Sequence, residues 1–126
     1  MRIIIKTTKI ELTKSLQDFI EEKVGSLEKF LEDILKKEDK LDGYQERARA
    51  FVEVGKSSLR HRKGNVFYAE CQITLPGKSI RAIAKREDLR LAICEVKDEL
   101  QRQLKEYKDS ITQQFKRSQR RVKKRF

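Results

Sequence analysis

The stretch VFYAECQITLPGKSIRAIAK, residues 66–85, decides the fold class of this chain. Apolar and polar side chains alternate from Val66 to Leu75, and a similar alternation runs from Ser79 to Lys85. Such alternation places one face of a strand against a core and the other in solvent, as in an antiparallel sheet that is covered on one side. Between the two runs, Pro76-Gly77 suits the central positions of a type II turn. The stretch therefore predicts a hairpin of two half-buried strands.

Segments on either side of the hairpin complete the pattern. Short strands are predicted at Arg2–Thr8, as an edge or near-edge strand, and at Ala48–Val54. Between them, apolar residues recur every three or four positions, which predicts one helix from an N-cap at Thr13 to about Leu35. A second amphipathic helix begins near Glu87-Asp88. The predicted fold class is α+β: a β-α-β-β-β-α sandwich in which two helices lie on one face of a four-stranded sheet.

The positive charge of the chain lies in its second half. The 126 residues carry a net charge of +11. Residues 1–55 hold 11 Lys/Arg and 12 Asp/Glu, whereas residues 56–126 hold 20 Lys/Arg and 8 Asp/Glu. A one-sided excess makes a directed field, whose commonest partner is a polyphosphate and whose rival target is an anionic membrane surface. We expect one α+β domain at residues 1–110, followed by a basic C-terminal tail at residues 111–126.

The sequence lacks the residue constellations of an enzyme. It contains no P-loop, no nucleophile elbow and no glycine-rich dinucleotide turn, and its one histidine, His61, stands among cations. Cys71 and Cys94 are too few for a zinc site and are interpreted as small buried thiols. We therefore expect no enzymatic activity, no cofactor, no metal and no small-molecule substrate. Because no run of ~18 apolar residues and no signal-peptide core is present, we expect a cytoplasmic protein that does not bind membranes.

Several short motifs follow one another in a characteristic order. They are Leu27-Glu28-Lys29-Phe30, His61-Arg62-Lys63-Gly64, Leu75-Pro76-Gly77-Lys78, Arg86-Glu87-Asp88-Leu89 and Leu100-Gln101-Arg102-Gln103-Leu104-Lys105. Across residues 1–108 this set resembles the ribosome hibernation-promoting factors, also known as ribosome-associated inhibitor, ribosomal subunit interface or sigma-factor modulation proteins. The resemblance is to the short form, since the sequence has no counterpart of the second domain by which long members join two ribosomes. It implies a fold similar to double-stranded-RNA-binding domains.

The resemblance also implies a function. Members of this family inhibit translation in stress or stationary phase by binding small-subunit ribosomal RNA in the channel of messenger and transfer RNA. The expected partners are the small ribosomal subunit and its RNA, and the protein is expected to be a monomer. By position, the resemblance assigns RNA contacts to Lys23, Lys29, Lys85, Arg86 and Arg102. Charge geometry, the basic loop and the tail add Arg62, Lys63, Lys105, Lys108, Lys116, Arg117, Arg120, Arg121, Lys123, Lys124 and Arg125.

Two alternatives remain open from the sequence. The first is a regulatory protein-interaction module, such as a sigma-factor modulator, which would stay in the soluble pool when ribosomes are sedimented. The second is a membrane-surface role for the tail, in which Phe115, Val122 and Phe126 would enter an anionic bilayer. The tail is short and self-repelling, so we expect the second helix to fray past Ile111 in the free protein.

Overall fold

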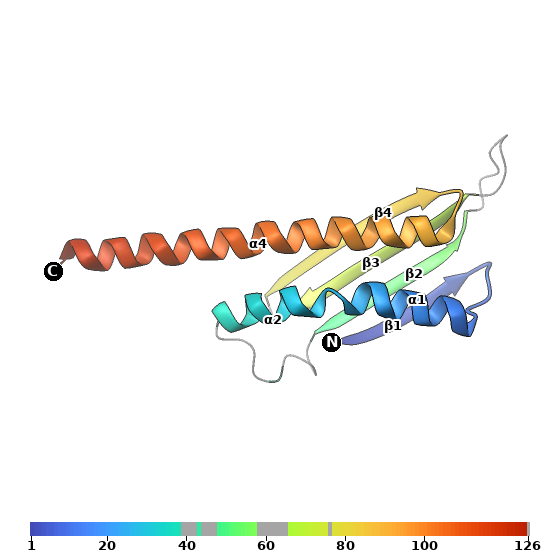
Figure 1. Cartoon of the computed structure of the whole chain (residues 1–126), viewed down its shortest axis with the longest axis horizontal. Coiled ribbons are helices and arrows are strands. Elements are labelled where there is room, and N and C mark those ends of the chain that lie inside the picture. The colour runs from blue at the N-terminus through green and yellow to red at the C-terminus, as the bar shows by residue number, and fades with distance from the viewer. Residues whose placement is uncertain (39–42, 44–47, 58–65, 76, 126) are drawn as a thin grey trace.

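The fold was analysed in a computed structural model that describes residues 1–38, 43, 48–57, 66–75 and 77–125. The predicted α+β sandwich is confirmed, with the described helices on one face of a four-stranded sheet (Figure 1). In chain order, the elements are β1 (Arg2–Thr8), α1 (Lys14–Gly25), α2 (Glu28–Lys37), β2 (Arg49–Lys56), β3 (Phe67–Leu75), β4 (Lys78–Arg86) and α4 (Leu89–Arg125).

The strands follow chain order across the sheet, β1-β2-β3-β4. β1 is an edge strand, as predicted, and pairs with β2 in parallel, whereas the other two pairings are antiparallel. The predicted hairpin is present, with Leu75 opposite Lys78 and Ile73 opposite Ile80. Gly77 has a φ of 81°, as the third position of a type II turn requires, while Pro76 lies outside the described residues.

The alternation in the strands matches the two faces of the sheet. Val52, Cys71 and Ile73 are at most 4% exposed and point toward the helices. The helices bury Leu27, Leu31, Ile34, Leu100 and Leu104 against them, each at most 1% exposed. Because each strand uses every second residue for this core, the intervening side chains point to the other face of the sheet.

The first predicted helix is wrong in one respect, because the structure divides it into α1 and α2. Thr13 caps α1 as predicted, since its Oγ1 accepts a hydrogen bond from the Leu16 N–H at 3.1 Å. At the break, glycine lowers the helix propensity at Gly25, and the Ser26 hydroxyl donates to the carbonyl of Lys23 at 2.6 Å. Leu27 is buried at the start of α2, so the apolar stripe continues through the break.

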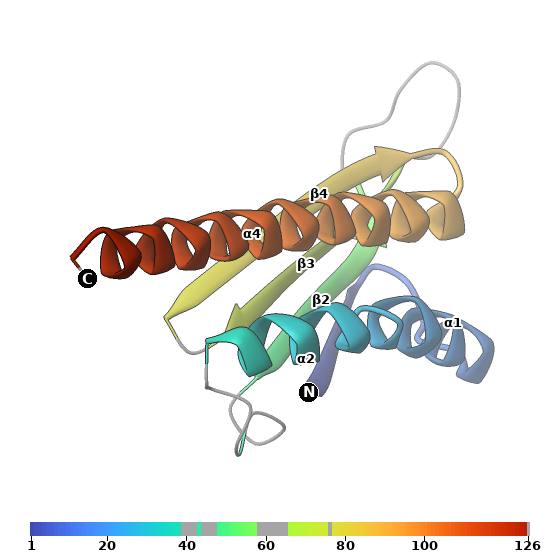
Figure 2. The same cartoon turned by 60° about the vertical axis from the view of Figure 1, so that its left-hand side comes forward.

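The second predicted helix is longer than expected. Asp88 caps it, because its Oδ1 accepts a hydrogen bond from the Arg90 N–H at 2.9 Å. The expected fraying past Ile111 is wrong, since α4 continues to Arg125 and projects well beyond the sheet (Figure 2). Residues 112–125 contain neither glycine nor proline and are rich in Lys, Arg and Gln, whose high helix propensity opposes the charge repulsion. Within the described part of the chain, every helix is too short or too polar to span a bilayer.

Candidate nucleic-acid interface

Two cations meet on one aromatic ring where α1 faces the first turns of α4. The guanidinium carbon of Arg90 lies 4.8 Å from the centroid of the Phe19 ring, and the ammonium nitrogen of Lys23 lies 5.6 Å from the same centroid. Arg90 also donates a hydrogen bond from Nη2 to the Ser15 hydroxyl at 2.9 Å. Cation–π attraction opposes the repulsion between the two side chains. The ring therefore holds Lys23 and Arg90 close together at the seam between the helices.

Further along the same seam, α2 contacts the middle of α4. Lys108 Nζ lies 3.2 Å from Asp33 Oδ2, and Lys37 Nζ donates to the Thr112 hydroxyl at 2.7 Å. Lys29 is exposed and lies one turn before Asp33, so it is on the α4 side of α2. Near the same contact, the hydroxyl of Tyr107 donates to a Glu38 carboxylate, and burial is the main reason that the pKa of Tyr107 rises to about 12.

These contacts define a line of basic side chains along the seam, which we term the helix-side cation row. Its members come from α1, α2 and α4. Lys97 belongs to it because it lies on the edge of α4 that faces α2, and Lys105 because it lies on the adjoining outer edge. Asp33 and Asp98 contact members of the row, the latter at 3.7 Å from Lys97. The row comprises Lys23, Lys29, Lys37, Arg90, Lys97, Lys105 and Lys108. A line of exposed and half-buried cations of this kind suits the phosphates of a nucleic acid.

The remaining cations predicted on the folded body lie on the other side of α4. There a cleft of about 820 Å³ separates α4 from the edge strand β4, and its walls include Lys85, Arg86 and Arg102 together with Glu95 and Glu99. Arg86 forms an ion pair with Glu95. The predicted RNA contacts therefore do not form one surface, because the structure divides them between the two sides of α4.

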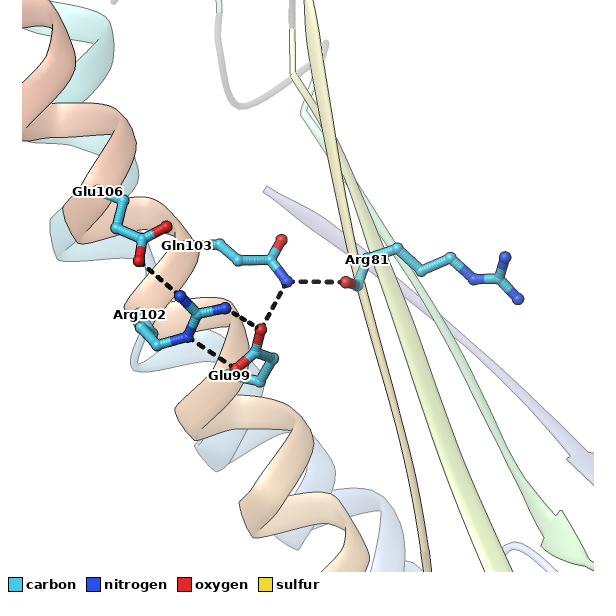
Figure 3. A network of polar contacts seen from close by, with 5 residues as sticks. All are labelled: Arg81, Glu99, Arg102, Gln103 and Glu106. Carbon is cyan, nitrogen blue, oxygen red and sulfur yellow. Dashed lines mark hydrogen bonds and ion pairs between the residues drawn. The ribbon is translucent and has the colours of Figure 1, made fainter.

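Arg102 is held by carboxylates of its own helix (Figure 3). Its guanidinium binds Glu99 one turn before it and Glu106 one turn after it, each at 2.5 Å. The hydrogen bond from Arg102 is the main reason that the pKa of Glu99 falls to about 2, and the same bond raises the pKa of Arg102. Gln103 completes this network by donating to Glu99 and to the backbone carbonyl of Arg81 at 3.0 Å. Among the predicted contacts whose side chains the structure describes, Arg102 is thus the one most firmly engaged within the protein.

The predicted contacts in the tail extend the positive charge away from the body. Lys116, Arg117 and Arg120 are exposed on the projecting part of α4. The backbone of α4 also includes Arg121, Lys123, Lys124 and Arg125. Arg62 and Lys63 lie outside the described residues.

Three members of the helix-side cation row were not among the predicted contacts. Arg90 and Lys97 fall within about 20° of Lys108 on a helical wheel, so the wheel contained the signal that places them there. Lys37 could not be placed in this way, because the predicted first helix ends at about Leu35. The structure instead extends α2 to Lys37.

The described residues hold no group of three or more His, Cys, Asp and Glu side chains that could bind a metal ion. Cys71 is buried in the sheet, and burial raises the pKa of its thiol to about 12, which keeps it protonated and unreactive. Cys94 is a free, half-buried thiol on α4, and His61 lies outside the described residues. The polar chemistry of the described surface is therefore that of exposed cations and ion pairs.

Comparison with known proteins gives one family and several related structures. The family described as "Sigma 54 modulation protein / S30EA ribosomal protein" matches residues 3–112. No curated protein matches the sequence. The N-terminal domain of Protein Y from Thermus thermophilus is 25% identical, with a TM-score of 0.64 over 85% of this chain and 99% of that domain. A ribosomal subunit interface protein from Coxiella burnetii is similar in fold, with 16% identity and a TM-score of 0.62 over 86% of this chain and 99% of that one.

Proposed function

Because this chain belongs to the Sigma 54 modulation protein / S30EA ribosomal protein family, we propose that it is a ribosome-binding inhibitor of translation. The members of this family are not enzymes, which agrees with the prediction from the sequence. In this proposal, the protein acts in the cytoplasm during stress or stationary phase and keeps ribosomes in hibernation. It binds as a monomer to small-subunit ribosomal RNA, in the channel that messenger and transfer RNA otherwise occupy.

The observation that carries this proposal is the helix-side cation row within the matched residues. Its members lie in residues 23–108, inside the family match at 3–112. Folded RNA presents phosphates and ribose hydroxyls on a defined shape, and proteins recognise that shape mainly through contacts with the sugar–phosphate backbone of the RNA. Of the contacts predicted from the sequence, Lys23, Lys29, Lys105 and Lys108 belong to this row. They are proposed to be the principal RNA contacts of the folded body.

The other predicted cations have separate roles in the proposal. Lys85 and Arg86 form a second, smaller contact at the junction of β4 and α4, where Arg86 must exchange Glu95 for a phosphate. The exposed Lys116, Arg117 and Arg120 extend the contact along the projecting part of α4. Arg102 contributes least, because its two carboxylates must be displaced before it can bind RNA.

Sedimentation of the purified protein with ribosomes tests the proposal. The protein should migrate with small subunits or whole ribosomes at low salt and be released as salt is raised, since each phosphate contact releases counterions. The family description also names sigma 54 modulation, which supports a protein-interaction module as the second candidate. Retention of the protein in the soluble fraction at low salt would favour that candidate.

A further inference from the structure

We propose that the face of the sheet opposite the helices is a binding surface for single-stranded RNA. This face, termed the open sheet face, consists of the outward side chains of β1 to β4. No helix among the described residues covers it, as both views of the fold agree (Figures 1 and 2). It lies on the other side of the molecule from the helix-side cation row. The proposal therefore concerns a second site, which shares only Lys85 with the contacts of the proposed function and does not depend on them.

The open sheet face exposes large apolar side chains. Phe51 on β2 is 47% exposed, Ile83 on β4 is 53% exposed, and Ile4 on β1 is 37% exposed. Ile4 and Phe51 are directly opposite one another in the β1–β2 ladder, so they form one patch. Phe51 is on an interior strand of the sheet, where its outward position leaves an aromatic face in solvent. Contiguous exposed apolar side chains of this kind are typical of a binding surface.

A second aromatic ring lies along the same face. A Cβ atom on Gly55 would be 2.9 Å from the hydroxyl oxygen of Tyr68 and 3.0 Å from its Cε1, so the ring of Tyr68 extends over the glycine. The Tyr68 hydroxyl donates to Glu53 Oε1 at 3.0 Å, which fixes the far end of the ring. The glycine thus makes room for a ring that lies across the sheet.

Each ring has a cation beside it. Arg2 on β1 is exposed and precedes Ile4, the partner of Phe51, by two residues, so it lies on the same face one pair along from Phe51. Lys85 on β4 is exposed and directly opposite Tyr68. A base can therefore stack on either ring while its phosphate meets a neighbouring cation, which is how single-stranded nucleic acids are commonly bound.

Carboxylates on the open sheet face are already engaged. Glu53 accepts hydrogen bonds from Tyr68 and, at 3.2 Å, from Thr8. Glu70 forms an ion pair with Arg81 at 2.5 Å. Two carboxylates thus stand among five cations on this face, the cations being Arg2, Lys6, Arg49, Arg81 and Lys85. The net charge of the face is positive, as an RNA strand requires.

The arrangement favours an unpaired strand over a duplex. The positions of Phe51 and Tyr68 are four residues apart in register, or about 13 Å along the strands. A strand of a few nucleotides spans this distance and offers free base faces, whereas a duplex conceals them in its stack. Lipid head groups have no planar face to place on these rings. A short single strand is therefore the ligand that uses both the rings and the cations.

Tryptophan fluorescence of the full chain tests this proposal directly, because the sequence contains no tryptophan. The variant Phe51→Trp places a reporter on the open sheet face. Leu91→Trp is the matched control, since Leu91 is 53% exposed, close to the 47% of Phe51, but is on α4. Titration with an eight-nucleotide oligouridylate should quench Phe51→Trp saturably and leave Leu91→Trp nearly unchanged. Equal quenching of both, or none in Phe51→Trp, would overturn the proposal.

Affinity measurements with a labelled form of the same oligouridylate distinguish binding at the open sheet face from binding at the helix-side cation row. Phe51→Ala should weaken binding about tenfold, whereas Phe51→Trp should retain it. Lys23→Glu with Lys105→Glu should have the smaller effect on this ligand. The proposal fails if Phe51→Ala binds the oligonucleotide as the wild type does, or if Phe51→Trp responds to anionic phosphatidylserine vesicles but not to the oligonucleotide. An unchanged melting temperature for Phe51→Ala would show that the fold is intact.

Discussion

The guanidinium of Arg90 stacks on the ring of Phe19, with 4.8 Å between the guanidinium carbon and the ring centroid. This contact joins α4 to α1 across the seam that the helix-side cation row follows. It also brings Arg90 near Lys23, which approaches the same ring. One aromatic side chain thus stabilises both the packing of two helices and a local concentration of positive charge.

Replacing this ring should destabilise the fold modestly. Phe19→Leu keeps an apolar side chain but removes the aromatic face, so the free energy of unfolding should fall by roughly 0.5–1 kcal/mol. Phe19→Trp keeps an aromatic face and should lower the free energy of unfolding by less. Urea unfolding of the two variants provides the measurement. Equal stability of the two would show that the cations gain nothing from the ring.

A buried and an exposed isoleucine on neighbouring strands test the two faces of the sheet. Ile73 is fully buried, so Ile73→Asp buries an unpaired charge and should unfold the protein. Ile83 is 53% exposed on the adjacent strand, so Ile83→Asp should leave the melting temperature nearly unchanged. Far-ultraviolet circular dichroism during heating distinguishes them. A folded Ile73→Asp variant would mean that the assignment of the faces is wrong.

The Arg102 network predicts a dependence of stability on pH. The pKa of Glu99 is lowered from 4.5 to about 2, mainly by the hydrogen bond from Arg102. A lowered carboxyl pKa adds stability above the unfolded value, and that stability is lost as the pH falls from about 5 toward 2. Glu99→Gln should therefore lower the melting temperature at pH 7 and have less effect near pH 2. The effect should be small because Glu99 and Arg102 are solvent-exposed. A difference between variant and wild type that does not change with pH would contradict the assignment.

Deletion of the tail tests whether it belongs to RNA binding or to folding. Removing Lys116–Phe126 takes away seven basic residues beyond the last α2–α4 contact at Thr112. Ribosome affinity and its salt dependence should fall, because phosphate contacts are lost, while the melting temperature should remain nearly unchanged. Sedimentation and thermal unfolding of the shortened chain measure the two effects. A large drop in melting temperature with affinity preserved would assign the tail to folding or self-association.

Much of the fold was predictable because local patterns and tertiary packing agree. The alternation in Val66–Leu75 predicted the hairpin, and the pairing of β3 with β4 confirms it, while Gly77 has the positive φ expected of the turn. The division of the first helix was not predictable from periodicity, because the buried Leu27 continues the apolar stripe across the break. The positive charge of the tail predicted that the end of the second helix would fray. In the structure the helix continues, because the helix propensity of the tail residues outweighs the charge repulsion.

The candidate site was predictable only in part, because residue type and helical angle do not show partners. A helical wheel of the second helix places Arg102 among acidic residues without showing which of them it binds, and the structure shows it bound to Glu99 and Glu106. The meeting of Lys23 with Arg90 on Phe19 depends on how α1 and α4 pack, which no local pattern contains. Similarly, the open sheet face follows from strand register, which brings Ile4 next to Phe51.

The central claim is that the helix-side cation row binds ribosomal RNA through its phosphates. The most direct measurement is the ribosome affinity of the double variant Lys23→Glu, Lys105→Glu across a salt titration. The control is Lys9→Glu, Lys14→Glu, which changes the charge equally at exposed positions away from the row. We predict that the first variant binds at least about tenfold more weakly, with a salt slope reduced by about one for each lost contact, while the control binds like the wild type. Equal affinity and equal salt slope for both variants would contradict the claim.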